Sequence, residues 1–106
     1  GMEVLYRAAT ARNGLFKKQP QPGDLIFLGN PRSEQNPVPS QVALVEFIDA
    51  EGTVYALGRF AEGPGRIRLN LNLEKQNSLV MSNTASGPTP TEVSIRELFW
   101  TYARPY

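Results

Sequence analysis

The sequence predicts an α+β fold: one N-terminal helix followed by a five-stranded antiparallel meander or half-barrel. Three observations lead to this prediction. Apolar residues recur at helical spacing near the start, short apolar or alternating runs follow, and Gly, Pro, Asn and Asp separate these runs. Consecutive strands joined by tight turns form a meander, which curls against the helix. Because the chain has 106 residues, we expect a single domain over 1–106.

The helix is expected at about residues 3–13, where Val4 and Ala8 belong to one apolar stripe. Gly14 follows, and glycine readily takes the left-handed conformation that ends a helix. Gly1 precedes Met2 and is typical of a residue left by cloning. The segment that begins at Met2 has no signal-peptide pattern, so we expect no export signal in this chain.

The first strand is predicted at residues 25–28, a continuous apolar run that suits burial on both faces. A turn with two prolines precedes it, and Asp24 at its end is expected to accept backbone hydrogen bonds. Residues 29–40 hold three prolines and little that a core would bury, so we predict a loop there.

A β-hairpin is predicted next. The strand at 42–48 is apolar on both faces, which is typical of a central strand. Residues 49–52 form the turn, because Gly52 can take the positive φ that tight hairpin turns need. The return strand is expected over 53–59.

The last third of the chain is predicted to hold two more strands and a long loop. Residues 66–71 alternate between polar and apolar, which indicates a half-buried strand. Residues 74–94 are mostly polar, and so long a loop in a compact domain is expected to be mobile or functional. A short turn and a closing strand are predicted over 95–103, where period-two alternation places Trp100 and Tyr102 on one face.

Composition excludes several kinds of chemistry. The chain has no cysteine and no histidine, which removes disulfides, thiolate catalysis, the usual neutral-pH base and nitrogen or sulfur zinc sites. The carboxylates show no spacing typical of a metal loop, so we expect no metal and no cofactor. Net charge is +1 with scattered Lys and Arg, which disfavours nucleic acid as a partner. No run of about 18 apolar residues occurs, so we expect no membrane insertion.

Three segments together resemble a known family: PGDLIF at 22–27, QVALVE at 41–46 and DAEGTV at 49–54. They are similar to the C-terminal half of the papain-like cell-wall hydrolases, the NlpC-type peptidases and CHAP domains. The match is best over residues 20–60. Members of that family cut amide bonds in peptidoglycan with a cysteine, a histidine and a polar residue that orients the histidine. The resemblance implies a papain-like core that lacks its first helix, the one that carries the cysteine.

The resemblance places the family's histidine at Gln41 and its orienting residue at Gly58. A glutamine amide is neutral and cannot act as a general base, and glycine has no side chain. We therefore expect a degenerate, catalytically inactive site and no hydrolase activity. The implied binding groove includes Gln41, Tyr55 and Arg59, and Arg59 would pair with a ligand carboxylate such as a peptide terminus.

Two functions remain open at this point. The first is binding of cell-wall peptides in the degenerate groove, which the resemblance implies together with a cell-envelope location. The second is a structural protein–protein interaction module, because loss of the first helix would leave an apolar sheet face uncovered. Its partner would be another protein or a second copy in a homodimer. A third function, binding of single-stranded nucleic acid, conflicts with the nearly neutral charge.

Overall fold

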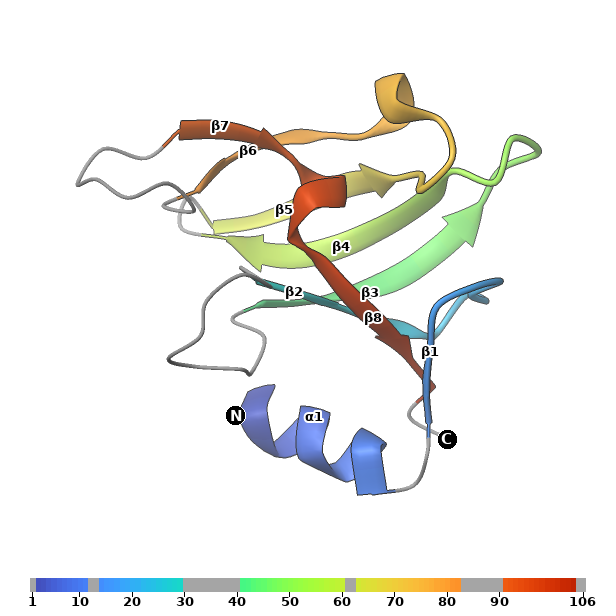
Figure 1. Cartoon of the computed structure of the whole chain (residues 1–106), viewed down its shortest axis with the longest axis vertical. Coiled ribbons are helices and arrows are strands. Elements are labelled where there is room, and N and C mark those ends of the chain that lie inside the picture. The colour runs from blue at the N-terminus through green and yellow to red at the C-terminus, as the bar shows by residue number, and fades with distance from the viewer. Residues whose placement is uncertain (1, 12–13, 30–40, 61–62, 83–90, 105–106) are drawn as a thin grey trace.

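The computed structural model describes residues 2–11, 14–29, 41–60, 63–82 and 91–104. It is a small α+β domain built around a curved antiparallel sheet (Figure 1), so the predicted α+β class is confirmed. Figure 1 shows the helix α1 (Met2–Ala11) on the outside of this sheet, while a two-stranded hairpin lies on the opposite side of the molecule.

The helices and strands follow one another along the chain as follows: α1 (Met2–Ala11), β1 (Leu15–Phe16), β2 (Leu25–Leu28), β3 (Gln41–Ile48), β4 (Val54–Phe60), β5 (Gly63–Leu69), the 3-10 turn η1 (Glu74–Gln76), β6 (Leu79–Ser82), β7 (Thr91–Ser94), the 3-10 turn η2 (Ile95–Leu98) and β8 (Phe99–Ala103). The main sheet has the order β1-β8-β2-β3-β4-β5, and β6 pairs only with β7. The predicted meander is right for β2 to β5. The prediction of five strands is wrong, because β1 is a sixth strand of this sheet. The predicted closing strand, β8, exists but lies between β1 and β2 rather than beside β5.

The segment 74–94 was predicted to be a loop, but it contains η1, β6 and β7. Two asparagines organise the turn that leads into it. The side chain of Asn77 accepts a hydrogen bond from the Asn70 backbone N–H at 2.7 Å and donates one to the Asn70 carbonyl at 2.9 Å. This side chain takes the place of a strand backbone, which hydropathy does not reveal. Residues 83–90 lie outside the described part of the chain, as do residues 30–40 of the proline-rich loop.

The main sheet has two faces with different surroundings. The inner face, on the concave side, carries the larger core cluster, formed by Ile26, Leu28, Ala43, Val45, Val54, Ala56, Ile67, Leu69, Ile95, Leu98 and Tyr102. Val80 of β6 and Val93 of β7 pack against this cluster. The outer face carries a smaller cluster in which Ala9 of α1 meets Phe27 and Ala103. The helix therefore covers the part of the outer face formed by β2 and β8.

Trp100 and Tyr102 were expected to share one face, and this prediction is wrong. Tyr102 belongs to the inner cluster, whereas Trp100 packs on the outer face, 6.0 Å edge-to-face from the ring of Tyr6. The pairing of β2 with β8 shifts register between Phe27 and Leu28. Such a bulge adds one residue to a strand and reverses its alternation, so residues two apart no longer share a face.

Asp24 has the turn role that the sequence predicts. Its fully buried carboxylate accepts a hydrogen bond from the Gln21 backbone N–H at 2.6 Å. It also accepts two from the guanidinium of Arg104, at 3.0 and 2.9 Å. Burial alone would raise the pKa of Asp24, but the hydrogen bonds and the charge of Arg104 outweigh it and lower that pKa. The pair ties the start of β2 to the end of β8.

Candidate functional site

Gln41 and Gly58, the two positions that the resemblance assigns to a catalytic pair, lie on neighbouring strands of the sheet. Gln41 is the first residue of β3, and Gly58 of β4 pairs with Ala43, two residues further along β3. Side chains alternate along a strand, and Ala43 and Ala56 both belong to the inner cluster. Gln41 and Gly58 therefore both belong to the inner face. Gln41 carries a neutral amide and Gly58 has no side chain, so neither of these two residues can take up a proton.

The other two predicted binding residues do not join Gln41. Tyr55 is on the outer face, because it alternates with the inner residues Val54 and Ala56. Its ring stacks on Phe47 with centroids 4.4 Å apart, and its hydroxyl donates a hydrogen bond to Asp49 at 3.3 Å. Arg59 has its backbone in β4, but its side chain lies outside what the structure describes. The groove expected from Gln41, Tyr55 and Arg59 is thus not assembled by the described side chains.

A different set of residues comes together on the outer face. Leu44 of β3 pairs directly with Leu57 of β4, and the stacked Phe47 and Tyr55 lie beside them on the same two strands. Leu44, Phe47 and Leu57 are 45%, 51% and 41% exposed. We call these four residues the outer patch. Helix α1 packs on β2 and β8 and leaves this part of the sheet open (Figure 1).

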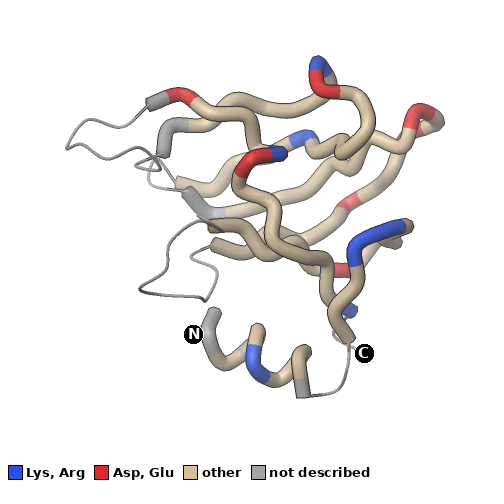
Figure 2. The backbone as a smooth tube through the Cα atoms, in the orientation of Figure 1, with Lys and Arg blue, Asp and Glu red and all other residues tan. Residues whose placement is uncertain are grey.

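Charges of both signs border the outer patch. A register shift between Val45 and Phe47 marks a bulge at Glu46. The Glu46 carboxylate accepts a hydrogen bond from Nε of Arg66 at 2.9 Å, and Arg66 pairs with Leu57 across β4 and β5. Figure 2 shows acidic and basic residues interspersed along the chain rather than gathered by sign. The patch is thus an apolar centre with a mixed polar rim.

A cleft of about 840 Å³ opens at one end of the main sheet. Its lining comes from the β1–β2 turn, the β3–β4 hairpin, the β5–η1 turn and β8: Lys17, Lys18, Gln19, Pro20, Ile48, Gly52, Val54, Asn70, Leu71, Asn72, Phe99, Trp100 and Tyr102. Burial raises the pKa of Tyr102 to about 12, so this phenol is neutral at physiological pH. None of the residues singled out by the sequence as a site lines this cleft.

Two further findings limit the kinds of site. Within the described ranges, no group of three or more Asp and Glu side chains is placed to hold a metal ion. Neither is any helix among those ranges long and apolar enough to cross a membrane.

No protein-family model matches this chain, and no curated protein or solved structure shows significant similarity to it. Functional inference therefore rests on the residues of the chain itself.

Proposed function

We propose that this chain is a catalytically inactive domain, related to the papain-like cell-wall hydrolases, that acts as an interaction module through its outer patch. The partner is a second copy of the chain. The observation that carries the proposal is the group of large apolar side chains left exposed on β3 and β4. The resemblance of residues 20–60 supports the relation to the hydrolases, and the sheet supports the interaction role.

The inactive part of the proposal is supported by the residues at the degenerate site. Gln41 and Gly58 are neighbours on one face, as the resemblance requires of a base and its orienting group. Neither residue transfers a proton, and the sequence holds no cysteine and no histidine to take over a role in amide hydrolysis.

The interaction part follows from the cost of exposing apolar side chains to water. Burial of apolar surface is worth about 25 cal/mol per Å², so the cross-strand pair Leu44 and Leu57 favours any contact that removes it from solvent. Aromatic residues frequently anchor interfaces, and Phe47 and Tyr55 offer two stacked rings in the same place.

A second copy fits this patch because the patch is complementary to itself. In a two-fold dimer each patch meets its own copy, so one surface has to supply both partners of every polar contact. Glu46 and Arg66 provide an acid and a base side by side at the rim. Under a two-fold rotation the acid of one copy can face the base of the other.

Edge-to-edge pairing of sheets is a less suitable mode. At the free edge of β5, the N–H and carbonyl of Arg68 already bond to Ser78, at 2.9 and 3.0 Å. Pro64, four residues earlier and on the same edge by alternation, has no N–H to give. The face of the sheet, rather than its edge, is therefore the surface for association.

A dilution series followed by methyl NMR tests the proposal. We expect the methyl resonances of Leu44 and Leu57 to shift with protein concentration, because they lie in the interface, while those of the buried Leu69 stay fixed. Shifts that are absent, or equal for Leu69, would refute the interface. Addition of intact peptidoglycan is expected to release no new amine groups, and any cleavage would refute the inactive assignment.

Cell-wall peptide binding at the degenerate site is the second candidate, favoured by the adjacency of Gln41 and Gly58. Titration with a muropeptide separates it from self-association. Amide shifts confined to Gln41 and the residues around Gly58 would assign a peptide site on the inner face. Amide shifts that occur only at the outer patch would argue against a peptide site on the inner face.

A further inference from the structure

We propose that the cleft at one end of the main sheet binds a carboxylate attached to an apolar body, as at the C-terminus of a peptide ending in an apolar residue. The cleft is separate from the outer patch, and this proposal does not depend on self-association. Its volume of about 840 Å³ lies within the usual range for small-ligand sites.

The charges at the cleft select an anion. Among the residues that the structure describes, Lys17 and Lys18 are the only charged ones that line it, and no described Asp or Glu side chain does so. They are also the only two basic residues adjacent in the sequence. The rest of the lining is neutral, so a ligand carboxylate at the two ammonium groups meets no competing acid within the cleft.

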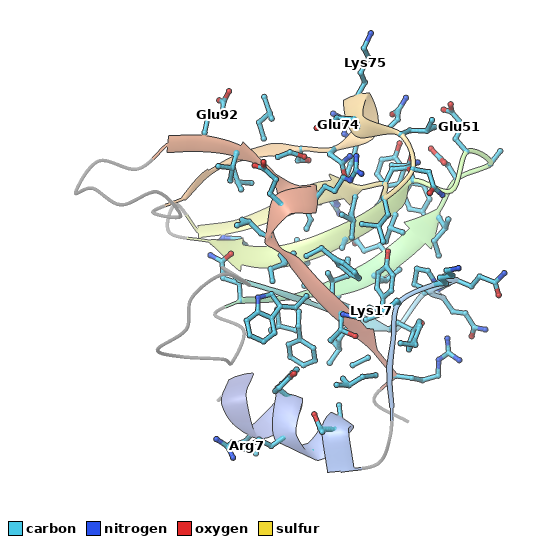
Figure 3. All side chains as sticks on the ribbon, in the orientation of Figure 1. Arg7, Lys17, Glu51, Glu74, Lys75 and Glu92 are labelled. Carbon is cyan, nitrogen blue, oxygen red and sulfur yellow. The ribbon has the colours of Figure 1, made fainter. Side chains whose placement is uncertain are left out.

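Lys17 is held in place by its neighbours. Its Nζ donates a hydrogen bond to the backbone carbonyl of Trp100 and lies 5.6 Å from the centroid of the Phe99 ring. An ammonium group has three N–H donors, so two remain for a ligand. Lys18 makes no hydrogen bond or ion pair with any residue that the structure describes, which leaves its charge available. Figure 3 shows Lys17 over the sheet, whereas Lys75 projects from η1 into solvent.

The turn that carries both lysines has a constrained backbone. Gln19 has φ of 59°, in a region that residues other than glycine rarely adopt. Pro20, whose ring restricts its own φ, follows directly. This geometry limits the positions open to the turn, so less freedom is lost when a ligand binds.

The floor of the cleft is apolar. Ile48, Val54, Leu71 and Tyr102 all line it, and each is part of the inner cluster or packs against it. A ligand that places an apolar group on this floor and a carboxylate at Lys17 and Lys18 satisfies both parts of the site. The amide of Asn72, which is exposed at the rim, can accept a backbone N–H of an extended peptide.

Isothermal titration with three probes tests this proposal: a tripeptide ending in phenylalanine with a free carboxylate, the same peptide as its C-terminal amide, and octanoate. We expect the free acid to bind and the amide to bind at least about tenfold more weakly, because charge-assisted hydrogen bonds are lost. If octanoate also binds, the site recognises carboxylates on apolar bodies in general. If only the peptide acid binds, it recognises a peptide terminus.

The variants Lys17→Gln and Lys18→Gln are each expected to lower the affinity for the free-acid peptide by about fivefold to tenfold. The matched control Lys75→Gln removes a lysine far from the cleft and should leave affinity unchanged. Leu57→Ser, which alters only the outer patch, should also bind normally, and this separates the cleft from self-association. Lys18→Gln removes an exposed side chain, so its fold is expected to persist, with an unchanged melting temperature as the check.

Three results would overturn the proposal. One is equal binding of the acid and the amide, another is an equal effect of Lys18→Gln and Lys75→Gln, and the third is no binding of the acid or of octanoate to the wild-type protein.

Discussion

The inner and outer faces of β3 and β4 differ although they belong to the same two strands. On the inner face Ala43, Ala56 and Gly58 are small and buried. On the outer face their neighbours Leu44 and Leu57 are large and exposed. Leu44 and Leu57 stay exposed on the outer face of the described part of the chain, and that difference is what points to a partner.

The outer face itself is divided in two. Over β2 and β8 the helix covers it, with the Tyr6 ring 5.3 Å from that of Phe27 in an edge-to-face contact. Around Leu44, Phe47 and Leu57 of β3 and β4 no described element covers it. Substitutions in the covered part should therefore destabilise the fold more than those in the open part.

Phe27→Ala is expected to have the largest effect, because it removes a fully buried ring beneath the helix. A loss of about 3–5 kcal/mol in the free energy of unfolding is typical of such a cavity. Phe47→Ala, the same change on the open part, should cost under about 1.5 kcal/mol, since that ring is exposed and loses mainly its stacking contact. Urea unfolding measures both, and similar losses would mean that the open part is as well packed as the covered part.

Asp24→Asn is expected to have the next largest effect. It should lower the free energy of unfolding by about 2–4 kcal/mol, because it removes a buried charge and takes the carboxylate away from Arg104. The pKa of Asp24 is lowered in the folded protein from its ordinary value of 3.8. The ion pair therefore stabilises the fold fully at pH values above 3.8, and this contribution is lost as the pH falls through the lower, folded-state pKa.

Urea midpoints measured from neutral to acidic pH follow this contribution. Below pH 3.8 the wild-type stability should fall towards that of Asp24→Asn. A difference between the two proteins that stays constant with pH would contradict the role of the Asp24 charge.

The stack of Phe47 on Tyr55 should contribute a smaller amount. A double-mutant cycle with Phe47→Leu and Tyr55→Leu is expected to give a coupling energy of about 0.5–1.5 kcal/mol, as is usual for aromatic pairs. A coupling energy near zero would show that the two rings stack only weakly in solution.

The ion pair of Glu46 with Arg66 is expected to have the smallest effect. Both groups are in contact with solvent, so Arg66→Gln should change the free energy of unfolding by less than about 1 kcal/mol. High salt should remove even this difference, because screening weakens exposed pairs. If the loss persisted in high salt, the pair would have to be shielded from water.

Much of the fold was predictable from the pattern of residues. Alternation and turn residues located β2 to β5 and the closing β8, and the helix was found at nearly its observed bounds. The order of strands was not predictable, because β8 lies beside β2 through contacts distant in sequence. The hairpin of β6 and β7 was not predicted. The turn that leads into it is stabilised by hydrogen bonds between Asn70 and the side chain of Asn77, and not by a recognisable turn dipeptide.

The candidate sites were less predictable. The sequence indicated an uncovered sheet face. It did not indicate the bulge at Glu46, which brings Phe47 opposite Tyr55 on that face so that the two rings stack. The residues that line the cleft are spread between positions 17 and 102 of the sequence, so no local motif predicts it. The adjacent Lys17 and Lys18 were the one signal in the sequence, and on their own they resemble ordinary solvated lysines.

Sedimentation equilibrium of the wild type and of Leu57→Ser tests the central claim most directly. We predict that the wild type associates to a dimer as its concentration rises and that Leu57→Ser remains a monomer. Leu79→Ser is the matched control, since it removes an even more exposed leucine, from β6 rather than from the patch, and it should dimerise like the wild type. A wild type that stays monomeric at every concentration, or a Leu57→Ser variant that still dimerises, would contradict the claim.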